Sequence, residues 1–321
     1  MQDLELMKPL ALVLGATGGI GGAIAARLAA DGYRVRALHR NPEGLDSRNR
    51  AWEWVRGDAM RPADVLAAAE GASLIVHAVN PPGYRDWGKL VLPMLDSTIA
   101  AAERVGARIL LPGTIYNYGP DTFPVIADDS PQNPHTEKGR IRAEMERRLE
   151  QAAQRGTPVL IVRAGDFFGP GAGNSWFNQG VIAPGKPVRS VTLPGDPGVG
   201  HSWAYLPDVA ETMMRLLRIS DRLPRFARFN MRGVWDEDGL GLVESIRRVT
   251  GRPVATSRMP WWALRLAAPF KPLFRELLAM RYVWRVPLRL DNSGLVRVLG
   301  EEPHTPLDMA MRETLRAAHA L

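Results

Sequence analysis

The sequence predicts an α/β fold built on a doubly wound, mostly parallel β-sheet, with a smaller C-terminal lobe interleaved with it. Short apolar runs of strand length alternate with segments of helical period over the first half of the chain, as in sheets whose strands are joined by crossover helices. The first run, residues 10–14, leads through a glycine-rich turn directly into a helical segment. Beyond residue 169 the alternation loosens and prolines and glycines become frequent. We therefore expect a sheet domain at residues 1–168 and a lobe at residues 169–321 that partly returns to the core of the first domain.

The elements of the first domain follow from these patterns in chain order. Strands are expected at 10–14, 34–38, 55–58, 74–77, 108–111 and 159–162, and helices at 22–28, 62–70, 86–105 and 133–155. Pro93 is expected to kink the third helix, and Asn133 and Pro134 are expected as the N-cap and first residue of the fourth. The apolar residues of this fourth helix recur at spacings of four and three (Ile141, Met145, Leu149 and Ala152), so that face is expected to pack on the sheet. Residues 228–230 and 240–246 are expected to return to the core as a strand and a helix.

The turn after the first strand has the composition of a nucleotide-phosphate loop. A pyrophosphate must approach backbone N–H groups closely at the positive end of a helix dipole, and glycine leaves the space for that approach. A strand before the glycines, a helix after them and a second strand at 34–38 complete a βαβ unit. The loop residues expected to contact a dinucleotide are Gly15, Thr17, Gly18, Gly19, Ile20 and Gly21.

The Gly-x-x-Gly-x-x-Gly spacing of this loop resembles that of the short-chain dehydrogenase/reductase superfamily, and four later segments resemble its extended branch, the NAD(P)-dependent epimerases/dehydratases. These segments are Val55–Asp58, residues 74–82, Arg163–Pro170 and Tyr205–Ala210. The resemblance implies a Rossmann-like fold and an oxidoreductase or epimerase that acts on a small carbonyl, sugar or secondary alcohol. It also implies that Asp58 binds the adenine amino group and that Ala78, Val79 and Asn80 line the cofactor.

The end of the second strand indicates which nicotinamide cofactor the chain uses. An acidic residue there would bind the ribose hydroxyls of NAD, but this chain has His39 and Arg40, with Arg36 earlier on the same strand. A guanidinium group pairs well with a 2′-phosphate. The sequence therefore favours NADP as cofactor, with NAD as the alternative.

The reactive end departs from the family pattern. The family uses a Ser or Thr, a Tyr and a Lys four residues after that Tyr, and the resemblance places Thr114 on the first position and Lys138 on the last. Pro134 occupies the tyrosine position, and proline cannot transfer a proton. Three hypotheses follow: Tyr116 or Tyr118 supplies the proton beside Lys138; Lys138 or a water that it holds is the acid, or the reaction needs no strong acid; or the chain binds NADP(H) without turnover, as a regulatory or sensor protein. Tyr116 is preferred to Tyr118, which matches a tyrosine that is usually structural in the family.

Other polar residues carry weaker signals. His77, at the end of an apolar strand, is interpreted as a buried structural histidine, and His201 as either a pocket or a structural residue. Asn174, Trp176 and Asn178 are expected at the entry of the C-terminal lobe. No spacing of His, Asp or Glu predicts a metal site, and a serine hydrolase would need a nucleophile elbow that the sequence lacks.

Composition agrees with a single cytoplasmic enzyme. The 321 residues include no cysteine, which excludes disulfides, thiol nucleophiles and thiolate metal sites, and the N-terminus does not resemble a signal peptide. The formal charge is +7, but its cations are scattered among acidic residues, so no nucleic-acid partner is expected. The apolar stretch 261–275 is interrupted by prolines and charges, so it is interpreted as a packed helix pair and no membrane partner is expected. A small-molecule substrate is expected, and a homodimer through 86–105 and 134–155 would be common in the family.

Overall fold

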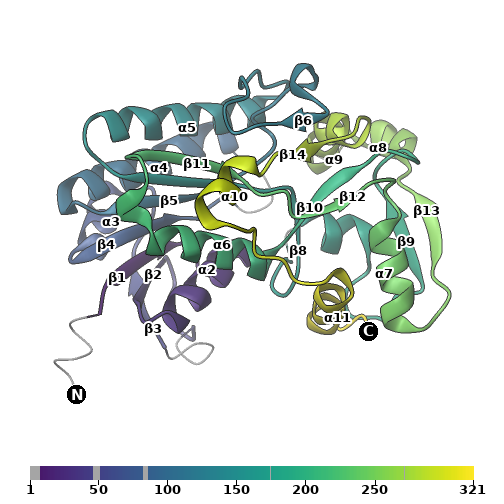
Figure 1. Cartoon of the computed structure of the whole chain (residues 1–321), viewed down its shortest axis with the longest axis horizontal. Coiled ribbons are helices and arrows are strands. Elements are labelled where there is room, and N and C mark those ends of the chain that lie inside the picture. The colour runs from purple at the N-terminus through teal and green to yellow at the C-terminus, as the bar shows by residue number, and fades with distance from the viewer. Residues whose placement is uncertain (1–7, 46–50, 82–85, 174, 271) are drawn as a thin grey trace. The chain divides into compact units, whose positions relative to one another are not determined.

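The computed structural model describes residues 8–45, 51–81, 86–173, 175–270 and 272–321 (Figure 1). The chain divides into two compact units. Unit 1 comprises the residues up to Gly113, Ile141–Val162 and Ala210–Arg228, and unit 2 comprises Thr114–Arg140, Arg163–Val209 and Phe229–Leu321. This division differs from the boundary expected at residue 168, because residues 114–140 belong to unit 2 and residues 210–228 to unit 1.

A seven-stranded, mostly parallel sheet with the order β11-β7-β5-β4-β1-β2-β3 confirms the predicted fold class. Its strands are β1 (Leu10–Leu14), β2 (Arg34–His39), β3 (Trp52–Arg56), β4 (Ala72–His77), β5 (Arg108–Gly113), β7 (Val159–Arg163) and β11 (Phe226–Asn230). β1 pairs in parallel with both β2 and β4. On one side of β1 the strands follow in the order β2 and β3, and on the other side in the order β4, β5, β7 and β11. In such sheets the loops at the carboxyl ends of the strands beside this reversal form the ligand site.

Helices separate the strands of this sheet along the chain. They are α2 (Gly19–Ala30), α3 (Pro62–Ala69), α4 (Trp87–Val105), α5 (Glu137–Gln154) and α6 (Leu206–Arg218). All five residues of β1 are buried, because a central parallel strand is covered on both faces. The apolar stripe of α5 packs into the core of unit 1 as predicted, with Ile141, Met145, Leu149 and Ala152 in that core.

The start of α5 was predicted incorrectly. The helix begins at Glu137 rather than at Pro134, and the Thr136 hydroxyl oxygen accepts a hydrogen bond from the Gly139 amide at 3.1 Å. Thr136 is therefore the N-cap, since its side chain satisfies a free N–H of the first turn. The Asn133 side chain donates instead to Asp121.

Unit 2 contains three small sheets and a set of short helices. The sheets have the orders β12-β10-β8, β13-β9 and β14-β6. Their strands are β6 (Val125–Ile126), β8 (Asp166–Phe168), β9 (Ser190–Leu193), β10 (His201–Tyr205), β12 (Val234–Asp236), β13 (Ala255–Arg258) and β14 (Arg289–Leu290). The helices are α7 (Gly241–Thr250), α8 (Trp261–Ala267), α9 (Pro272–Ala279), α10 (Ser293–Leu299) and α11 (Leu307–Ala317). Short turns of other helix types occur in unit 2 at Pro120–Thr122, Phe177–Val181 and Met280–Trp284, and in unit 1 at Ser220–Arg222.

The helix expected at 240–246 is α7, but it does not return to the core of the first domain. Its buried residues Leu242, Val243 and Ile246 belong to the core of unit 2, together with residues of α11. The prediction for this helix was wrong because an amphipathic pattern shows that one face of a helix is buried but not which core covers that face.

The stretch 261–275 forms α8 and the start of α9. Trp261 is buried and its indole N–H donates to the Pro194 carbonyl oxygen at 3.1 Å. Trp262 and Leu266 are 71% and 69% exposed, so only one face of α8 packs in unit 2. Within the described ranges, no helix has both the length and the apolar character needed to cross a membrane.

Candidate functional site

The glycine loop joins β1 to α2 in unit 1, and two of its glycines are required by backbone packing. Gly15 has φ +92°, and a Cβ at this position would lie 2.5 Å from the Ala78 carbonyl oxygen. A Cβ on Gly21 would lie 2.2 Å from the Gly15 carbonyl oxygen. Both glycines therefore allow the end of β1, the start of α2 and the chain after β4 to approach one another closely. This packing requirement for glycine was not predicted from the sequence.

Gly18 is different because the fold itself does not require a glycine there. Its φ is −86° and it is the N-cap of α2, with no side-chain cap. A Cβ would meet only the Gly15 carbonyl oxygen, at 3.3 Å. The amide of Gly18 donates to that same oxygen at 3.0 Å. The loop is therefore less crowded by backbone at Gly18 than at Gly15 or Gly21, and the positive end of a helix suits a phosphate. Thr17 lies in the turn before Gly18, and Gly19 and Ile20 are the first two residues of α2.

The end of β2 separates the two arginines that the sequence analysis considered for a 2′-phosphate. Arg36 donates to the carbonyl oxygens of Ala68 and Glu70 at 2.9 and 3.0 Å, and it forms an ion pair with Glu53 at 3.0 Å. Its guanidinium therefore stabilises the end of α3. Arg40 lies in the exposed turn after β2, so Arg40 is the better placed of the two to meet a ligand.

Apart from Lys138, which lies in unit 2, the remaining predicted cofactor residues also lie in unit 1, at the ends of its strands or in the turns that follow them. The His39 ring accepts a hydrogen bond from the Asn41 amide at 3.1 Å, and Asp58 Oδ1 accepts one from the Met60 amide at 3.0 Å. Ala78, Val79 and Asn80 follow β4. Arg142 donates to Asn80 Oδ1 at 3.0 Å, so α5 holds this turn in place.

His77 at the end of β4 is buried, as the sequence analysis interpreted it. The Thr98 hydroxyl donates to the Met94 carbonyl oxygen, so its oxygen accepts from His77 Nδ1 at 2.8 Å. Burial lowers the pKa of His77 to about 3, and the Arg142 guanidinium contributes in the same direction. The imidazole is therefore neutral at physiological pH.

This depressed pKa makes stability depend on pH. Below the usual histidine pKa of about 6.5, the unfolded chain takes up a proton that the folded chain refuses, so the free energy of unfolding falls as the pH is lowered from there toward 3. We expect His77 to account for a loss of about 2–3 kcal/mol between pH 7 and about pH 4.5. His77→Leu should remove this part of the pH dependence, as measured by urea unfolding at several pH values. A variant with the same pH dependence as the unmodified protein would contradict the assignment.

The three predicted catalytic residues lie together in unit 2. Thr114 and Tyr116 follow β5, and the Thr114 hydroxyl oxygen accepts from the Tyr116 amide at 3.4 Å. Lys138 lies in the first turn of α5. A Cβ on Gly139 would lie 2.3 Å from the Tyr116 carbonyl oxygen, so this glycine allows α5 to begin directly against the Thr114–Tyr116 loop.

Lys138 and Tyr116 each have an acidic partner. Lys138 is 6% exposed and its Nζ lies 2.9 Å from Glu276 Oε2. Burial lowers the pKa of Lys138, while the hydrogen bond and charge of Glu276 oppose that shift. The Tyr116 hydroxyl donates to Asp166 Oδ1 at 2.9 Å. The phenol is thus coupled to a carboxylate that the sequence analysis did not single out.

Tyr118 has a different environment. Its side chain is fully buried, the Arg163 guanidinium lies over its ring at 5.5 Å, and its carbonyl oxygen accepts from the Tyr282 hydroxyl at 3.1 Å. These contacts are those of a core residue. They support the preference for Tyr116 as the candidate proton donor.

Asp166 and His201 form a pair that sequence reasoning did not find. Trp203 on β10 is in register with Asp166 on β8, which places His201 near the carboxylate. His201 Nε2 lies 2.8 Å from Asp166 Oδ2, and the His201 ring stacks on Trp284 with centroids 3.8 Å apart. The available signal was that Asp166 falls in the family-like segment Arg163–Pro170 and that His201 was a candidate pocket residue, but their pairing depends on strand register in unit 2.

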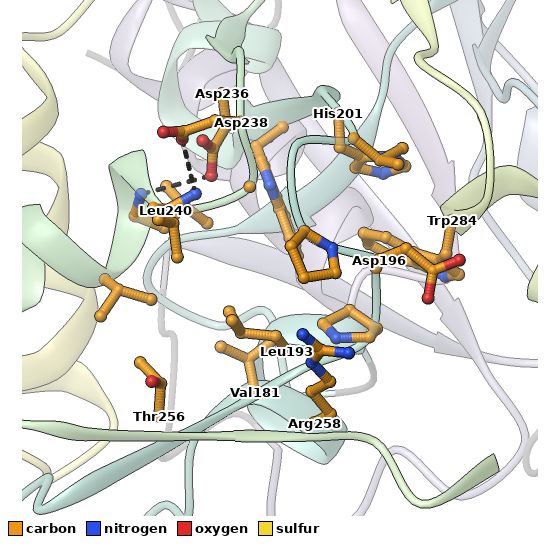
Figure 2. A pocket seen from close by; sticks show the side chains of 18 of the residues that line it. Val181, Leu193, Asp196, His201, Asp236, Asp238, Leu240, Thr256, Arg258 and Trp284 are labelled. Carbon is orange, nitrogen blue, oxygen red and sulfur yellow. Dashed lines mark hydrogen bonds between the residues drawn. The ribbon is translucent and has the colours of Figure 1, made fainter.

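A cavity of about 260 Å³ lies in unit 2 beside His201 (Figure 2). Its walls are largely apolar, and its polar edge includes Asp196, Asp236 and Asp238. Asp236 accepts from the amides of Gly241 and Leu242. Burial raises the pKa of Asp236, and these backbone hydrogen bonds oppose the shift.

The remaining polar residues considered at the lobe entry do not line this cavity. Trp176 contacts Trp284 edge-on with centroids 5.4 Å apart, and the Asn178 amide donates to Ser175. Asn174 lies outside the described residues. In the part of the chain that the structure describes, no three His, Asp or Glu side chains form a group able to hold a metal ion.

Comparison with known proteins places these features in context. The sequence model described as "NAD dependent epimerase/dehydratase family" matches residues 11–231. An uncharacterized protein, y4nL, of Sinorhizobium fredii is 31% identical over 188 residues, 52% of this chain and 53% of that protein, so the chain spans about half the length of this relative. The D-erythronate dehydrogenase of Cupriavidus necator is 28% identical over 240 residues, 68% of this chain and 71% of that protein. The solved structure of MoeE5 in complex with UDP-glucose and NAD is similar in fold, with a TM-score of 0.74, 19% identity and coverage of 96% of this chain and 98% of that one.

Proposed function

Because the chain belongs to the NAD dependent epimerase/dehydratase family, we propose that it is an NADP-dependent oxidoreductase or epimerase that acts on a small carbonyl compound, a sugar or a secondary alcohol. The glycine loop carries this proposal. Gly15 and Gly21 are required by backbone packing, whereas a Cβ on Gly18 would meet only the Gly15 carbonyl oxygen, at 3.3 Å, and the space there suits a pyrophosphate at the start of α2.

The residues present in unit 1 fit such a cofactor. Gly19 and Ile20 would present backbone N–H groups to the pyrophosphate, Gly18 would leave space for it, Thr17 would lie beside it, and Asp58 would bind the adenine amino group. His39 and Arg40 would meet the adenosine ribose, and Ala78, Val79 and Asn80 would line the bound dinucleotide. When bound, the nicotinamide supplies the exchange of a hydride with a substrate carbon.

In unit 2, Tyr116 is the proposed proton donor and Thr114 the group that orients the substrate oxygen. Lys138, the family's ribose-binding lysine, is proposed to keep this role, with Glu276 holding its ammonium group. D-erythronate dehydrogenase acts, by its name, on a hydroxylated sugar acid, and MoeE5 binds UDP-glucose. Both support a sugar-like substrate for this chain.

The test of the proposed function is turnover. Purified protein should oxidise NADPH in the presence of at least one member of a panel of short-chain keto-sugars, aldoses and keto acids, or reduce NADP⁺ with the matching alcohols, as followed by absorbance. An epimerase should instead interconvert two epimers of a sugar with no net change of the cofactor, as followed by chromatography. Pro134, which the resemblance places at the family's tyrosine position, favours a second candidate, a sensor that binds NADP(H) without turnover. That candidate expects tight cofactor binding, no oxidation and no epimerisation with any member of the panel.

Cofactor preference is expected to depend on Arg40. NADPH should bind more tightly than NADH by roughly 10- to 100-fold, because a charge-assisted hydrogen bond to the 2′-phosphate contributes about 1.5–3 kcal/mol. Arg40→Asp should abolish or reverse the preference, as measured by calorimetry with both cofactors. Arg34→Asp makes the same change of charge at the opposite end of β2 and should leave the preference intact. Equal affinities in the unmodified protein would refute the NADP assignment.

A further inference from the structure

Three large apolar side chains of unit 2 are exposed close together in the sequence, on α8 and in the turn after it. Trp262, Leu266 and Phe270 are 71%, 69% and 85% exposed, and no other large apolar side chain that the structure describes exceeds 56%. Single exposed apolar residues are common on protein surfaces, whereas a group of them marks an interaction site. We call these three residues the α8 patch.

The packing of α8 explains why the patch is exposed. Trp261 occupies the buried face of the helix, where its indole N–H donates to the Pro194 carbonyl oxygen at 3.1 Å. Successive residues of an α-helix lie about 100° apart, and residues four apart share a face. Trp262 and Leu266 therefore share a second face of α8, turned by about 100° or more from Trp261. Phe270 follows in the turn after the helix.

Basic residues dominate the part of the sequence that contains the patch. Residues 245–290 include ten lysines and arginines but one acidic residue, Glu276. The carboxylate of Glu276 is already paired with the Lys138 ammonium group at 2.9 Å. Because the whole chain has a formal charge of +7, the rest of the chain contains slightly more acidic than basic residues. The positive charge of the protein is therefore concentrated in this segment of unit 2.

Two of these cations are available beside the patch. Arg265 lies on α8, three residues after Trp262 and next to Leu266, and Arg275 lies on α9, which lies against α8 (Figure 1). Both arginines are exposed, and neither forms an ion pair or a side-chain hydrogen bond with any residue in the described ranges. A guanidinium group without an acidic partner can pair with an external anion such as a phosphate.

These features fit an anionic lipid surface better than a protein partner. Tryptophan, phenylalanine and leucine beside arginine are typical of helices that lie in the interface of anionic membranes, where the apolar side chains insert between headgroups and the cations pair with lipid phosphates. A second copy of the chain would bring the same cations against one another across a two-fold interface, where like charges repel. A partner protein would need a matching pocket for each protruding side chain, which a fluid lipid interface does not.

We propose that unit 2 docks reversibly on anionic lipid membranes through the α8 patch. Trp262, Leu266 and Phe270 insert at the level of the headgroups, and Arg265 and Arg275 contact lipid phosphates. This docking differs from the expectation that residues 261–275 form a packed helix pair with no membrane partner, because only one face of α8 is packed. It goes beyond the proposed function and does not depend on it.

Vesicle flotation with the full chain tests this docking. Vesicles of phosphatidylcholine with about one third of the anionic lipid phosphatidylglycerol should bind at least tenfold more protein than vesicles of pure phosphatidylcholine. Raising sodium chloride from about 0.05 M to about 0.5 M should release most of the bound protein, because salt screens the attraction between arginine and phosphate. No binding to the anionic vesicles, or equal binding to both kinds, would overturn the proposal.

A matched pair of apolar variants locates the contact. The double variant Leu266→Ser/Phe270→Ser should lower binding to the anionic vesicles by about tenfold or more, because both side chains lose their burial in the interface. Met309→Ser changes a side chain of α11 that is 56% exposed in the same unit and should bind normally. Circular dichroism verifies that both variants fold. Unchanged binding of the double variant, or an equal loss in Met309→Ser, would refute the α8 patch as the contact.

A second pair of variants tests the cations. Arg265→Glu should lower binding to the anionic vesicles by about tenfold or more, because it reverses one charge at the membrane surface. Arg316→Glu makes the same change at an exposed position of α11 and should have little effect. Equal losses in the two variants would mean that net charge alone drives binding, contrary to the proposal.

Sedimentation velocity without lipid tests a second copy of the chain as the occupant. The unmodified protein and Leu266→Ser/Phe270→Ser should have the same oligomeric state. An oligomer that the double variant loses would instead assign the patch to a self-interface. NADPH binding should be unchanged in all of these variants, because none of the substituted residues belongs to the proposed cofactor or catalytic site. A failure of docking would therefore leave the proposed function standing, and a failure of NADPH binding would leave the docking surface standing.

Discussion

Gly18→Val is expected to remove dinucleotide binding while leaving the protein folded. Gly18 has φ −86° and ψ 165°, an extended conformation that valine adopts readily, and a Cβ there meets only one backbone oxygen, at 3.3 Å. The isopropyl group would occupy the space that a pyrophosphate needs at the start of α2. We expect the affinity for NADPH to fall by roughly 100-fold or more, about 2.7 kcal/mol, as measured by calorimetry, with an unchanged circular dichroism spectrum.

Gly21→Ala provides the contrasting control. Its Cβ would lie 2.2 Å from the Gly15 carbonyl oxygen, which only a shift of the backbone can relieve. This substitution should lower the free energy of unfolding by several kcal/mol, since forced backbone rearrangement in a packed core is among the costlier single changes. Retention of micromolar NADPH binding in Gly18→Val would mean that this loop is not the phosphate site.

Tyr116→Phe is expected to lower turnover by about 10²–10⁴-fold, the range for losing one positioned proton donor. Cofactor affinity should change little, because the proposed dinucleotide contacts are made by other residues. The phenol hydroxyl donates to Asp166, so the variant also frees one oxygen of that carboxylate. Rates with and without the substitution, measured on the substrate identified in the turnover panel, check this prediction. Full activity in Tyr116→Phe would reject this residue as the donor.

Two companion variants separate the roles within this site. Thr114→Val should reduce turnover less than Tyr116→Phe, because it removes an orienting hydrogen bond rather than the proton. Lys138→Ala should weaken both turnover and cofactor affinity if Lys138 holds the nicotinamide ribose. Because Lys138 is buried against Glu276, urea unfolding of this variant is needed to distinguish a loss of function from a loss of stability. Activity that survives all three substitutions would reject the whole site.

The sequence was sufficient to predict the sheet and the loop that follows β1. Both depend on local signals: a fully apolar five-residue strand, glycines at fixed spacing and a helix directly after them. The same local reasoning failed at the start of α5, where Asn133 and Thr136 are both suitable N-caps: the Thr136 hydroxyl caps the helix, while the Asn133 side chain donates to Asp121. Local propensity cannot choose between two caps when tertiary packing decides where the helix begins.

The amino-acid sequence by itself thus determined the fold class and the glycine-rich loop after β1, because each is expressed in neighbouring residues or in a regular period. Only the tertiary structure decided that Gly15 and Gly21 serve packing, since a Cβ on either would lie within 2.5 Å of a backbone oxygen, whereas a Cβ on Gly18 would meet only the Gly15 carbonyl oxygen at 3.3 Å. Likewise, only the tertiary structure brought together Tyr116, Asp166 and His201. Tyr116 and Asp166 are 50 residues apart in the sequence, and Asp166 and His201 are 35 residues apart. Their contacts arise from strand register and from side chains that pack across unit 2, and no pattern along the chain encodes which of many buried polar groups will meet.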